Sequence, residues 1–111
     1  MPRDYDDYLN DIIDAILKIE AFTKGMTFEV FKEDDKTVFA VIRAMEIIGE
    51  ATKHIPEDVR EQHPQVPWKA MAGMRDVLIH NYFGVNLETI WITAKEKIPS
   101  VESSLKKMLG E

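Results

Sequence analysis

Apolar residues recur at three- and four-residue steps along nearly the whole chain, and this periodicity restricts the fold more than any other feature. Between residues 4 and 24, for example, they form one wide face: Tyr8, Leu9, Ile12, Ile13, Ile16, Leu17 and Ile19. Residues at this spacing share one side of an α-helix, whereas the residues of a half-buried strand alternate. No segment alternates in that way, so we expect an all-α protein.

Acidic residues, glycines and prolines divide the first half of this pattern into helices. A first long helix is expected over about 4–24, because acidic residues at its start and a Lys-Gly pair at its end suit the helix dipole and a C-terminal glycine. Residues 27–32 form either a helical turn or a loop. Asp34 or Asp35 then caps a second long helix that ends near His54, before a proline.

The second half contains a short helix and two further long ones. The short helix is expected over 57–62. A third long helix begins at Pro67 or Trp68, because proline suits the first helical turn, and it stops at Gly84. Asn86 caps a fourth helix, in which Pro99 causes either a kink or a restart. The sequence therefore predicts a four-helix-bundle-like fold.

Length, charge and cysteine content exclude several classes of protein. The 111 residues, expected to form a single domain over 1–111, leave no room for a second core. A formal net charge of −6 excludes nucleic-acid binding through a broad basic surface. The chain has no cysteine, and so no disulfide or thiolate metal site. Since no signal peptide and no apolar run of about 20 residues are present, we expect a cytoplasmic protein.

The apolar residues outnumber those that one narrow stripe on each helix would need. A short chain with such a surplus has a further apolar face to bury, and a two-fold dimer is the commonest way to bury it. A well-filled monomeric core is the alternative. We expect the dimer.

The three histidines do not form a metal-binding pattern. None of them pairs with another at the i, i+4 spacing that presents two imidazoles on one helix face. His54 is expected at a helix C-terminus, and His63 in an exposed link. We expect no metal and, in the absence of a glycine-rich phosphate loop, no nucleotide cofactor.

A dense cluster of reactive side chains occurs near the end of the third long helix: Arg75, Asp76, His80, Asn81 and Tyr82. His80 is suited to take a proton from a ribose 2′-hydroxyl or to give one to a leaving oxygen. Arg75 is suited to hold a phosphate by its planar fork. Asp76 and Asn81 can orient these two groups. The residue types suit RNA cleavage without a metal.

Helix geometry complicates this interpretation. On a straight helix Arg75 and His80 are about 140° apart, whereas Arg75 and Tyr82 nearly superpose. Arg75 and His80 therefore converge only if the helix end unwinds near Gly84 or if a second subunit closes the site. The alternative is a purely structural cluster, in which Arg75 and Asp76 pair with neighbouring charges, His80 caps the helix and Tyr82 fills the core.

The spacing Arg75-x4-His80-x-Tyr82 resembles the signature of the HEPN ribonucleases, in the form found in HepT-type toxins. The similarity extends over most of the chain. It includes the strings Ile47-Ile48-Gly49-Glu50-Ala51, Ile55-Pro56, Pro67-Trp68-Lys69, Ala72-Gly73-Met74-Arg75-Asp76 and Tyr82-Phe83-Gly84-Val85, with Trp91 and Pro99.

This resemblance implies an HEPN fold with short additional helices, and a homodimer in which the two motif-bearing helices meet in a cleft. It implies a metal-independent RNase toxin, paired with a small nucleotidyltransferase antitoxin of the MntA type that transfers AMP to the motif tyrosine. Arg75 and His80 would then be catalytic, Asp76 and Asn81 supporting, and Tyr82 the modification site.

Three further positions have mixed interpretations. Glu50 either lines the cleft or belongs to a solvated helix face. Gly49 and Gly73 are expected to be sites of close packing without a chemical role, because glycine within a helix costs roughly 1 kcal/mol relative to alanine.

The leading function is thus an endoribonuclease toxin. The alternatives are a non-catalytic helical dimer that binds nucleotides or a partner nucleotidyltransferase, and a plain helical dimer without a ligand.

Overall fold

The computed structural model describes residues 4–80 and 86–110, with the backbone alone for 75–80. Every regular element in these ranges is helical, which confirms the all-α prediction. The elements are α1 (Tyr5–Thr23), α2 (Phe28–Glu33), α3 (Asp35–Lys53), α4 (Glu57–Gln62), α5 (Trp68–His80), α6 (Leu87–Ile92), the π-helical turn η1 (Thr93–Lys97) and α7 (Ile98–Met108). None of the described helices is both long and apolar enough to span a membrane.

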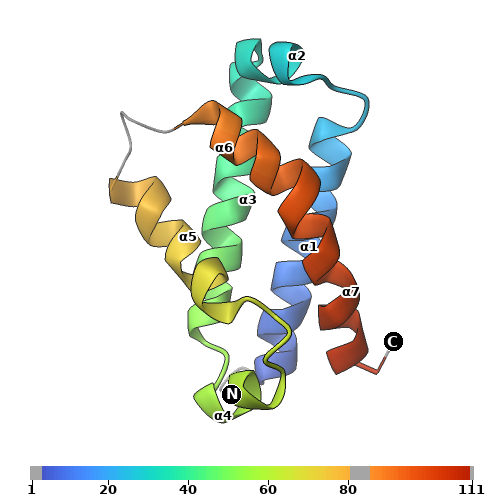
Figure 1. The fold of residues 1–111 in the computed structure, drawn as a ribbon, viewed down its shortest axis with the longest axis vertical. Coiled ribbons are helices and arrows are strands. Elements are labelled where there is room, and N and C mark those ends of the chain that lie inside the picture. Colours follow the sequence, from blue (N-terminus) through green and yellow to red (C-terminus); the bar gives the residue numbers. More distant parts are fainter. Residues whose placement is uncertain (1–3, 81–85, 111) are drawn as a thin grey trace.

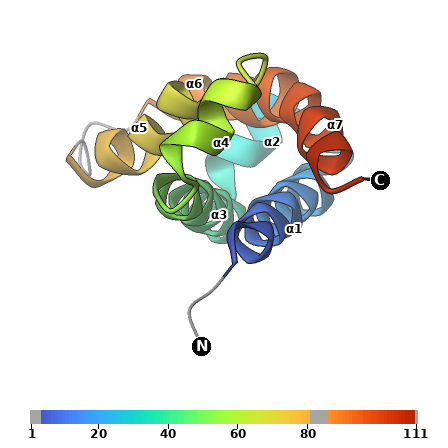
Figure 2. The same ribbon diagram turned by 90° about the horizontal axis from the view of Figure 1, so that it is seen from below.

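The long helices pack as a bundle around one core (Figure 1). Helices α1 and α3 lie side by side, α5 packs against α3, and the rod formed by α6, η1 and α7 crosses α1. Figure 2 shows the same bundle from below. The largest fully buried apolar side chains come from α1, α2, α3, α7 and the link after α3: Leu9, Ile12, Ile16, Ile19, Phe31, Val41, Met45, Ile48, Ile55 and Leu105. Each such burial contributes about 1.5–3 kcal/mol to folding.

The beginnings of α2, α3 and α6 are fixed by side-chain caps. Thr27 Oγ1 accepts a hydrogen bond from the backbone N–H of Val30 at 3.2 Å, so residues 27–32 form a helical turn and not a loop. Asp34, and not Asp35, caps α3, since its Oδ1 accepts from the N–H of Thr37 at 3.0 Å. These hydrogen bonds satisfy backbone donors that have no partner within the helix.

The predicted cap of the fourth long helix is confirmed, because Asn86 Oδ1 accepts from the N–H of Thr89 at 3.1 Å. At Pro99 the structure agrees with a restart. A π-helical turn, Thr93–Lys97, separates α6 from α7, and α7 begins at Ile98 with Pro99 in its first turn. Proline lacks an N–H and crowds the preceding turn, and the wider turn of a π-helix accommodates both effects.

Some residues predicted for the apolar faces are exposed. Leu17, which the periodicity placed on the apolar face of the first helix, is 45% exposed, and Phe39 on α3 is 64% exposed. Phe22, Val30 and Ile92 are also exposed. The folded chain thus keeps the apolar surplus on its surface, while the dimer itself stays a prediction.

Candidate functional site

The candidate catalytic cluster falls on the second half of α5. Arg75 and Asp76 lie within this helix, and His80 is its last residue. Asn81 and Tyr82 lie outside the described residues, as does the predicted helix end at Gly84. The structure therefore places the backbone of the first three and tests the roles of none of the five.

The start of α5 is anchored through its tryptophan. Trp68 is 6% exposed, and its Nε1 donates a hydrogen bond to the carbonyl oxygen of His63 at 3.0 Å. One turn later Met71 is buried in the core. These contacts hold α5 against α3 and set the direction in which it carries the motif.

Because α5 is helical through His80, the angle of about 140° between positions 75 and 80 holds. Positions 75 and 80 therefore belong to different faces of α5. A single straight helix does not bring the two positions together.

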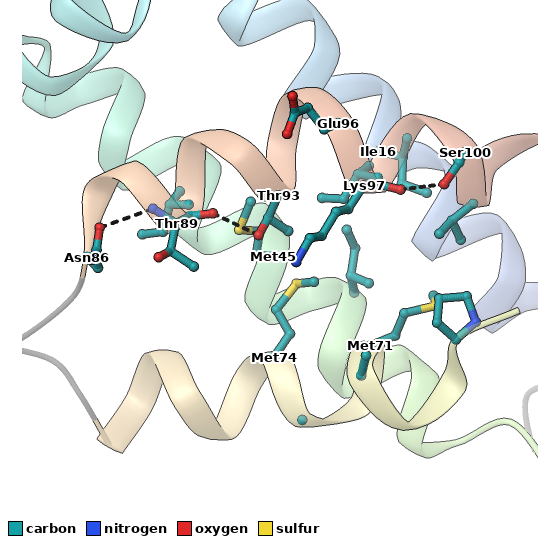
Figure 3. Close-up of a pocket in the computed structure, with 17 residues that line it drawn as sticks. Ile16, Met45, Met71, Met74, Asn86, Thr89, Thr93, Glu96, Lys97 and Ser100 are labelled. Carbon is teal, nitrogen blue, oxygen red and sulfur yellow. Dashed lines mark hydrogen bonds between the residues drawn. The ribbon is translucent and has the colours of Figure 1, made fainter.

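An apolar groove of about 930 Å³ runs between α5 and the rod of α6, η1 and α7 (Figure 3). Met71 and Met74 of α5 line one side of it, and Ile16 of α1 and Met45 and Ile48 of α3 also line it. The hydroxyls on the opposite wall bond to their own helix: Thr93 Oγ1 donates to the carbonyl of Thr89, and Ser100 Oγ to that of Lys97, both at 2.8 Å. The hydrogens of both hydroxyls are therefore used in hydrogen bonds within the rod.

Lys97 is the cation that this groove offers. Its side chain extends across the opening toward Met74 on α5 (Figure 3). The sequence pattern did not reveal Lys97, because a linear pattern does not show that η1 faces α5. Lys97 is therefore placed to contact an anionic group that binds in this groove beside α5.

Gly73 also lines the groove, and its role differs from the one expected. A Cβ placed on Gly73 would meet no described atom within 4 Å. Close packing at this position is therefore wrong for the part of the chain that the structure describes. Gly49 is buried in α3, as close packing requires.

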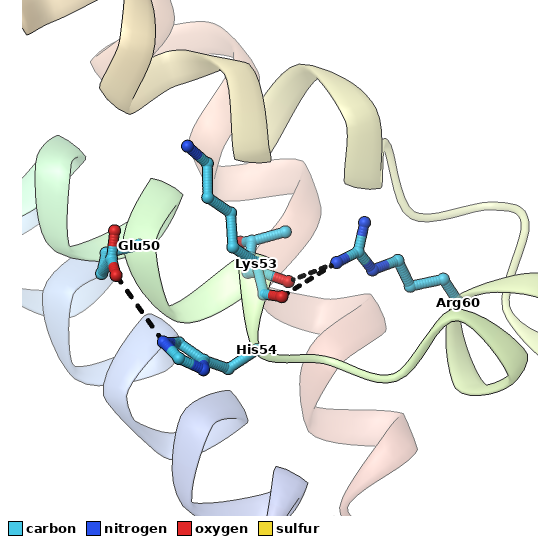
Figure 4. A network of polar contacts seen from close by, with 5 residues as sticks. Glu50, Lys53, His54 and Arg60 are labelled. Atoms are coloured by element: carbon cyan, nitrogen blue, oxygen red, sulfur yellow. Dashed lines mark hydrogen bonds and ion pairs between the residues drawn. The ribbon is translucent and has the colours of Figure 1, made fainter.

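The end of α3 gathers a second polar cluster (Figure 4). His54 lies at the C-terminus of α3 as predicted, where its ring stacks on Tyr8 with 4.7 Å between centroids. Its Nε2 is 3.6 Å from Oε1 of Glu50. The Glu50 side chain is 53% exposed in the single chain, so both interpretations of this residue stay open.

Arg60 on α4 was not singled out from the sequence, yet it closes the end of α3. Its Nε donates to the carbonyl of Ile55 at 3.0 Å, and its Nη2 to those of Thr52 and Lys53 at 3.0 and 3.3 Å. The last carbonyls of a helix lack partners within the helix. A guanidinium suits them because it has several N–H donors and a positive charge. The neighbouring His63 is partly buried and not exposed as expected, because Trp68 packs against its backbone.

Among residues 4–80 and 86–110, no three His, Asp or Glu side chains gather closely enough to hold a metal ion. The side chain of His80 lies outside that description. Independence from metal thus stays a prediction.

The fold and the place of the motif define the class of protein: an all-α bundle of the HEPN type that carries Arg75 and His80 on one long helix. The model of the family described as "Ribonuclease HepT-like" matches residues 12–108. The chain belongs to this family and is a ribonuclease.

Individual relatives agree with the family match. The chain is 55% identical over 108 residues to "Probable ribonuclease HepT" of Thermococcus cleftensis, covering 97% of this chain and 98% of the relative. It is 46% identical to "Putative RNase MJ1216" of Methanocaldococcus jannaschii, covering 98% and 90%. A third relative, "Putative RNase TTE0752" of Caldanaerobacter subterraneus, is 46% identical, covering 92% and 91%. No solved structure gives a match.

Proposed function

We propose that this ribonuclease is the toxin of a toxin–antitoxin pair: a metal-independent endoribonuclease that cleaves cellular RNA in a cleft shared by two copies of the chain. The observation that carries the proposal is the spacing Arg75-x4-His80-x-Tyr82 in the sequence, with Arg75 and His80 on α5, in a chain that matches the HepT-like family over residues 12–108. The two catalytic positions are about 140° apart on one straight helix, which supports a site completed by a second copy.

The proposed chemistry needs an acid, a base and a cation. A neutral His80 takes the proton of a ribose 2′-hydroxyl, the 2′-oxygen bonds to phosphorus, and the bond from phosphorus to the 5′-oxygen breaks. The protonated His80 of the second copy gives its proton to that leaving oxygen. Arg75 stabilises the charge that develops on the phosphoryl oxygens. The products are a 2′,3′-cyclic phosphate and a 5′-hydroxyl.

The remaining motif residues support these groups. Asp76 and Asn81 orient the imidazole or the guanidinium through hydrogen bonds. The net charge of −6 restricts RNA binding to a local cationic site. Lys97 in the groove beside α5 supplies a cation for that site in addition to Arg75.

An assay of RNA cleavage with the purified protein tests this function. Arg75→Ala and His80→Ala are expected to abolish cleavage while leaving the helical content, measured by circular dichroism, unchanged. A chelator such as EDTA is expected to have no effect, because no metal takes part in the proposed chemistry. Cleavage by either variant, or its loss in EDTA, would contradict the mechanism. A wild-type protein that folds and dimerises but never cleaves RNA would favour the non-catalytic dimer that binds nucleotides or a partner nucleotidyltransferase.

We further propose that the partner is a small nucleotidyltransferase antitoxin of the MntA type, which transfers AMP to Tyr82. Tyr82 follows Arg75 by seven residues, so on a continuous helix the two positions would lie about 20° apart. An adenylylated phenol would place an anion beside Arg75, where the RNA phosphate is proposed to bind.

Mass spectrometry of the protein co-expressed with that transferase tests the switch. The wild type is expected to gain the mass of AMP on Tyr82 and to lose activity. Tyr82→Phe is expected to fold, to cleave RNA and to escape inhibition. An inhibited protein whose Tyr82 is unmodified would reject this form of regulation.

A further inference from the structure

The apolar groove beside α5 has the size and the lining of a binding site for a small molecule. Its volume of about 930 Å³ lies within the range of roughly 300–1,000 Å³ that such sites have in proteins. Apolar side chains from several helices line it, among them Ile16, Met45, Met74 and Ile90. Because the phosphates and riboses of RNA are polar, cleavage of RNA does not explain this apolar lining.

Lys97 gives this groove a positive charge. Its ammonium has no hydrogen bond or ion pair among the described residues, and its side chain extends across the opening toward Met74 (Figure 3). Glu96, the other charged residue of the described lining, points away from α5 (Figure 3). The hydroxyls of Thr93 and Ser100 already donate to backbone carbonyls at 2.8 Å. A ligand in the groove therefore meets a cation at the opening and apolar side chains below it.

Gly73 leaves open space at the groove. Glycine within a helix costs roughly 1 kcal/mol relative to alanine. Gly73 lines the groove, and a Cβ at this position would meet no described atom within 4 Å. Packing within the described part of the chain thus gives no reason for a glycine here. A ligand that lies over this position gives one.

We propose that the groove binds a small amphiphile with one unbranched apolar chain and one anionic head group, such as a carboxylate. The apolar chain lies against Met45, Met71 and Met74, whose flexible thioether side chains adapt to ligands of different shape. The head group accepts a charge-assisted hydrogen bond from the ammonium of Lys97.

Two other classes of ligand fit this groove less well. A nucleobase is bound by stacking on aromatic rings and by hydrogen bonds to its edges, and no aromatic residue is among the described residues of the lining. A membrane surface is bound by apolar side chains that project from the protein, whereas these side chains line a groove between α5 and the rod (Figure 3). The observations favour a single amphiphile that enters the groove from water.

Calorimetric titration of the purified protein with decanoate tests the site. We expect saturable binding with a negative change in heat capacity, because apolar surface is buried. Lys97→Gln is expected to raise the dissociation constant of decanoate by about fivefold and to leave that of decan-1-ol, the same chain without a charge, unchanged. The matched control is Lys69→Gln. Lys69 is an exposed lysine of α5 outside the lining, so this variant is expected to bind decanoate as the wild type does.

Gly73→Leu tests the open space in the groove. Its side chain is expected to occupy part of the groove and to weaken the binding of both decanoate and decan-1-ol. The helical content, measured by circular dichroism, is expected not to fall, because leucine favours a helix more than glycine does. Lys69→Leu adds the same side chain to α5 outside the groove and is expected to leave the binding of both probes unchanged.

The binding site does not rest on the proposed function, because the measured quantity is binding. Lys97 is also proposed to contact RNA, so bound decanoate is expected to lower the rate of RNA cleavage. This consequence alone rests on the proposed function. Decanoate that binds without changing cleavage would support the site and contradict the role of Lys97 in RNA binding.

Three outcomes would overturn the proposal. The first is a wild type that does not bind decanoate, including one that binds vesicles of anionic phospholipid instead. The second is unchanged binding of decanoate by Gly73→Leu, which would place the ligand outside the groove. The third is unchanged binding by Lys97→Gln, which would show that the anionic head group is not recognised there.

Discussion

At the scale of single residues, Arg60 shows how one side chain can join two elements. It lies on the short helix α4, and its guanidinium donates to the carbonyls of Thr52, Lys53 and Ile55 at the end of α3. Hydrogen bonds from charged groups are roughly twice as strong as those between neutral groups. Arg60 therefore fixes the chain reversal after α3 and, through it, the link that leads to α5.

Replacing Arg60 tests this role. Arg60→Ala is expected to lower the free energy of unfolding by about 1–3 kcal/mol, because three backbone carbonyls lose a hydrogen bond from a charged donor, although that of Thr52 keeps a bond from the N–H of Ile55. Arg60→Lys is the matched control. A single ammonium cannot reproduce the planar fork, so it is expected to recover only part of the loss. Urea unfolding measures both variants, and equal midpoints for all three proteins would contradict the role.

Replacement of glycine by alanine is expected to have opposite effects on stability at Gly73 and at Gly25. Neither glycine would place a Cβ within 4 Å of another atom, but Gly25 has a φ of +76° and Gly73 lies within α5. Gly73→Ala is expected to stabilise the fold by about 1 kcal/mol and to raise Tm by roughly 4 °C. Gly25→Ala is expected to destabilise it, because residues with a Cβ are strained at positive φ. Thermal unfolding decides, and a fall in Tm for Gly73→Ala would indicate a contact that the single chain lacks.

The sequence predicted residues whose role depends on near neighbours in the chain and missed those whose role depends on distant ones. The caps Asp34 and Asn86 bind N–H groups three residues ahead, so a linear pattern reveals them. Arg60 binds carbonyls of another helix, and Lys97 extends into a groove walled by α5. Periodicity carries no information about such contacts.

At the scale of elements, capping explains where the helices begin. The sequence did not decide whether the short segment after α1 forms a helical turn or a loop. The hydrogen bond from the N–H of Val30 to Thr27 Oγ1 shows that it is a helical turn. Pro99 was expected to kink or restart the last helix, and α7 does begin at Ile98 with Pro99 in its first turn. The π-helical turn before it was not expected from the local sequence.

The cap of α3 makes the stability of the protein depend on pH. The hydrogen bond from the N–H of Thr37 favours the ionised form of Asp34 and lowers its pKa below the ordinary value of 3.8. A depressed pKa contributes stability above the unfolded value, and this contribution is lost as the pH falls through the folded value. Asp34→Asn keeps a capping oxygen but does not titrate at this position.

Thermal unfolding between pH 6 and pH 3 measures this dependence. The wild type is expected to be the more stable protein at pH 6, and its advantage over Asp34→Asn is expected to shrink as the pH falls below about 4. A constant difference in Tm over the whole range would show that the charge on Asp34 contributes nothing to the cap.

At the scale of the whole molecule, the bundle could be predicted but the complete site could not. Helical periodicity, glycines and prolines predicted each long helix, because these features act within a few residues. The exposure of Phe39 on α3 could not be predicted, since periodicity alone does not separate a core-facing phenylalanine from one on the outer face of the helix.

A composite site predicts that one defective copy inactivates its partner. If the cleft uses His80 of both copies, one as base and one as acid, a dimer of wild type and His80→Ala has no activity. Equal amounts of the two chains, co-expressed with different tags, assort at random, so about one quarter of the dimers are fully wild type. The expected activity per total protein is therefore about one quarter of the wild-type value, compared with about one half if each chain acted alone. An RNA cleavage assay on the mixture distinguishes the two values, and a result near one half would assign a complete catalytic site to each single chain.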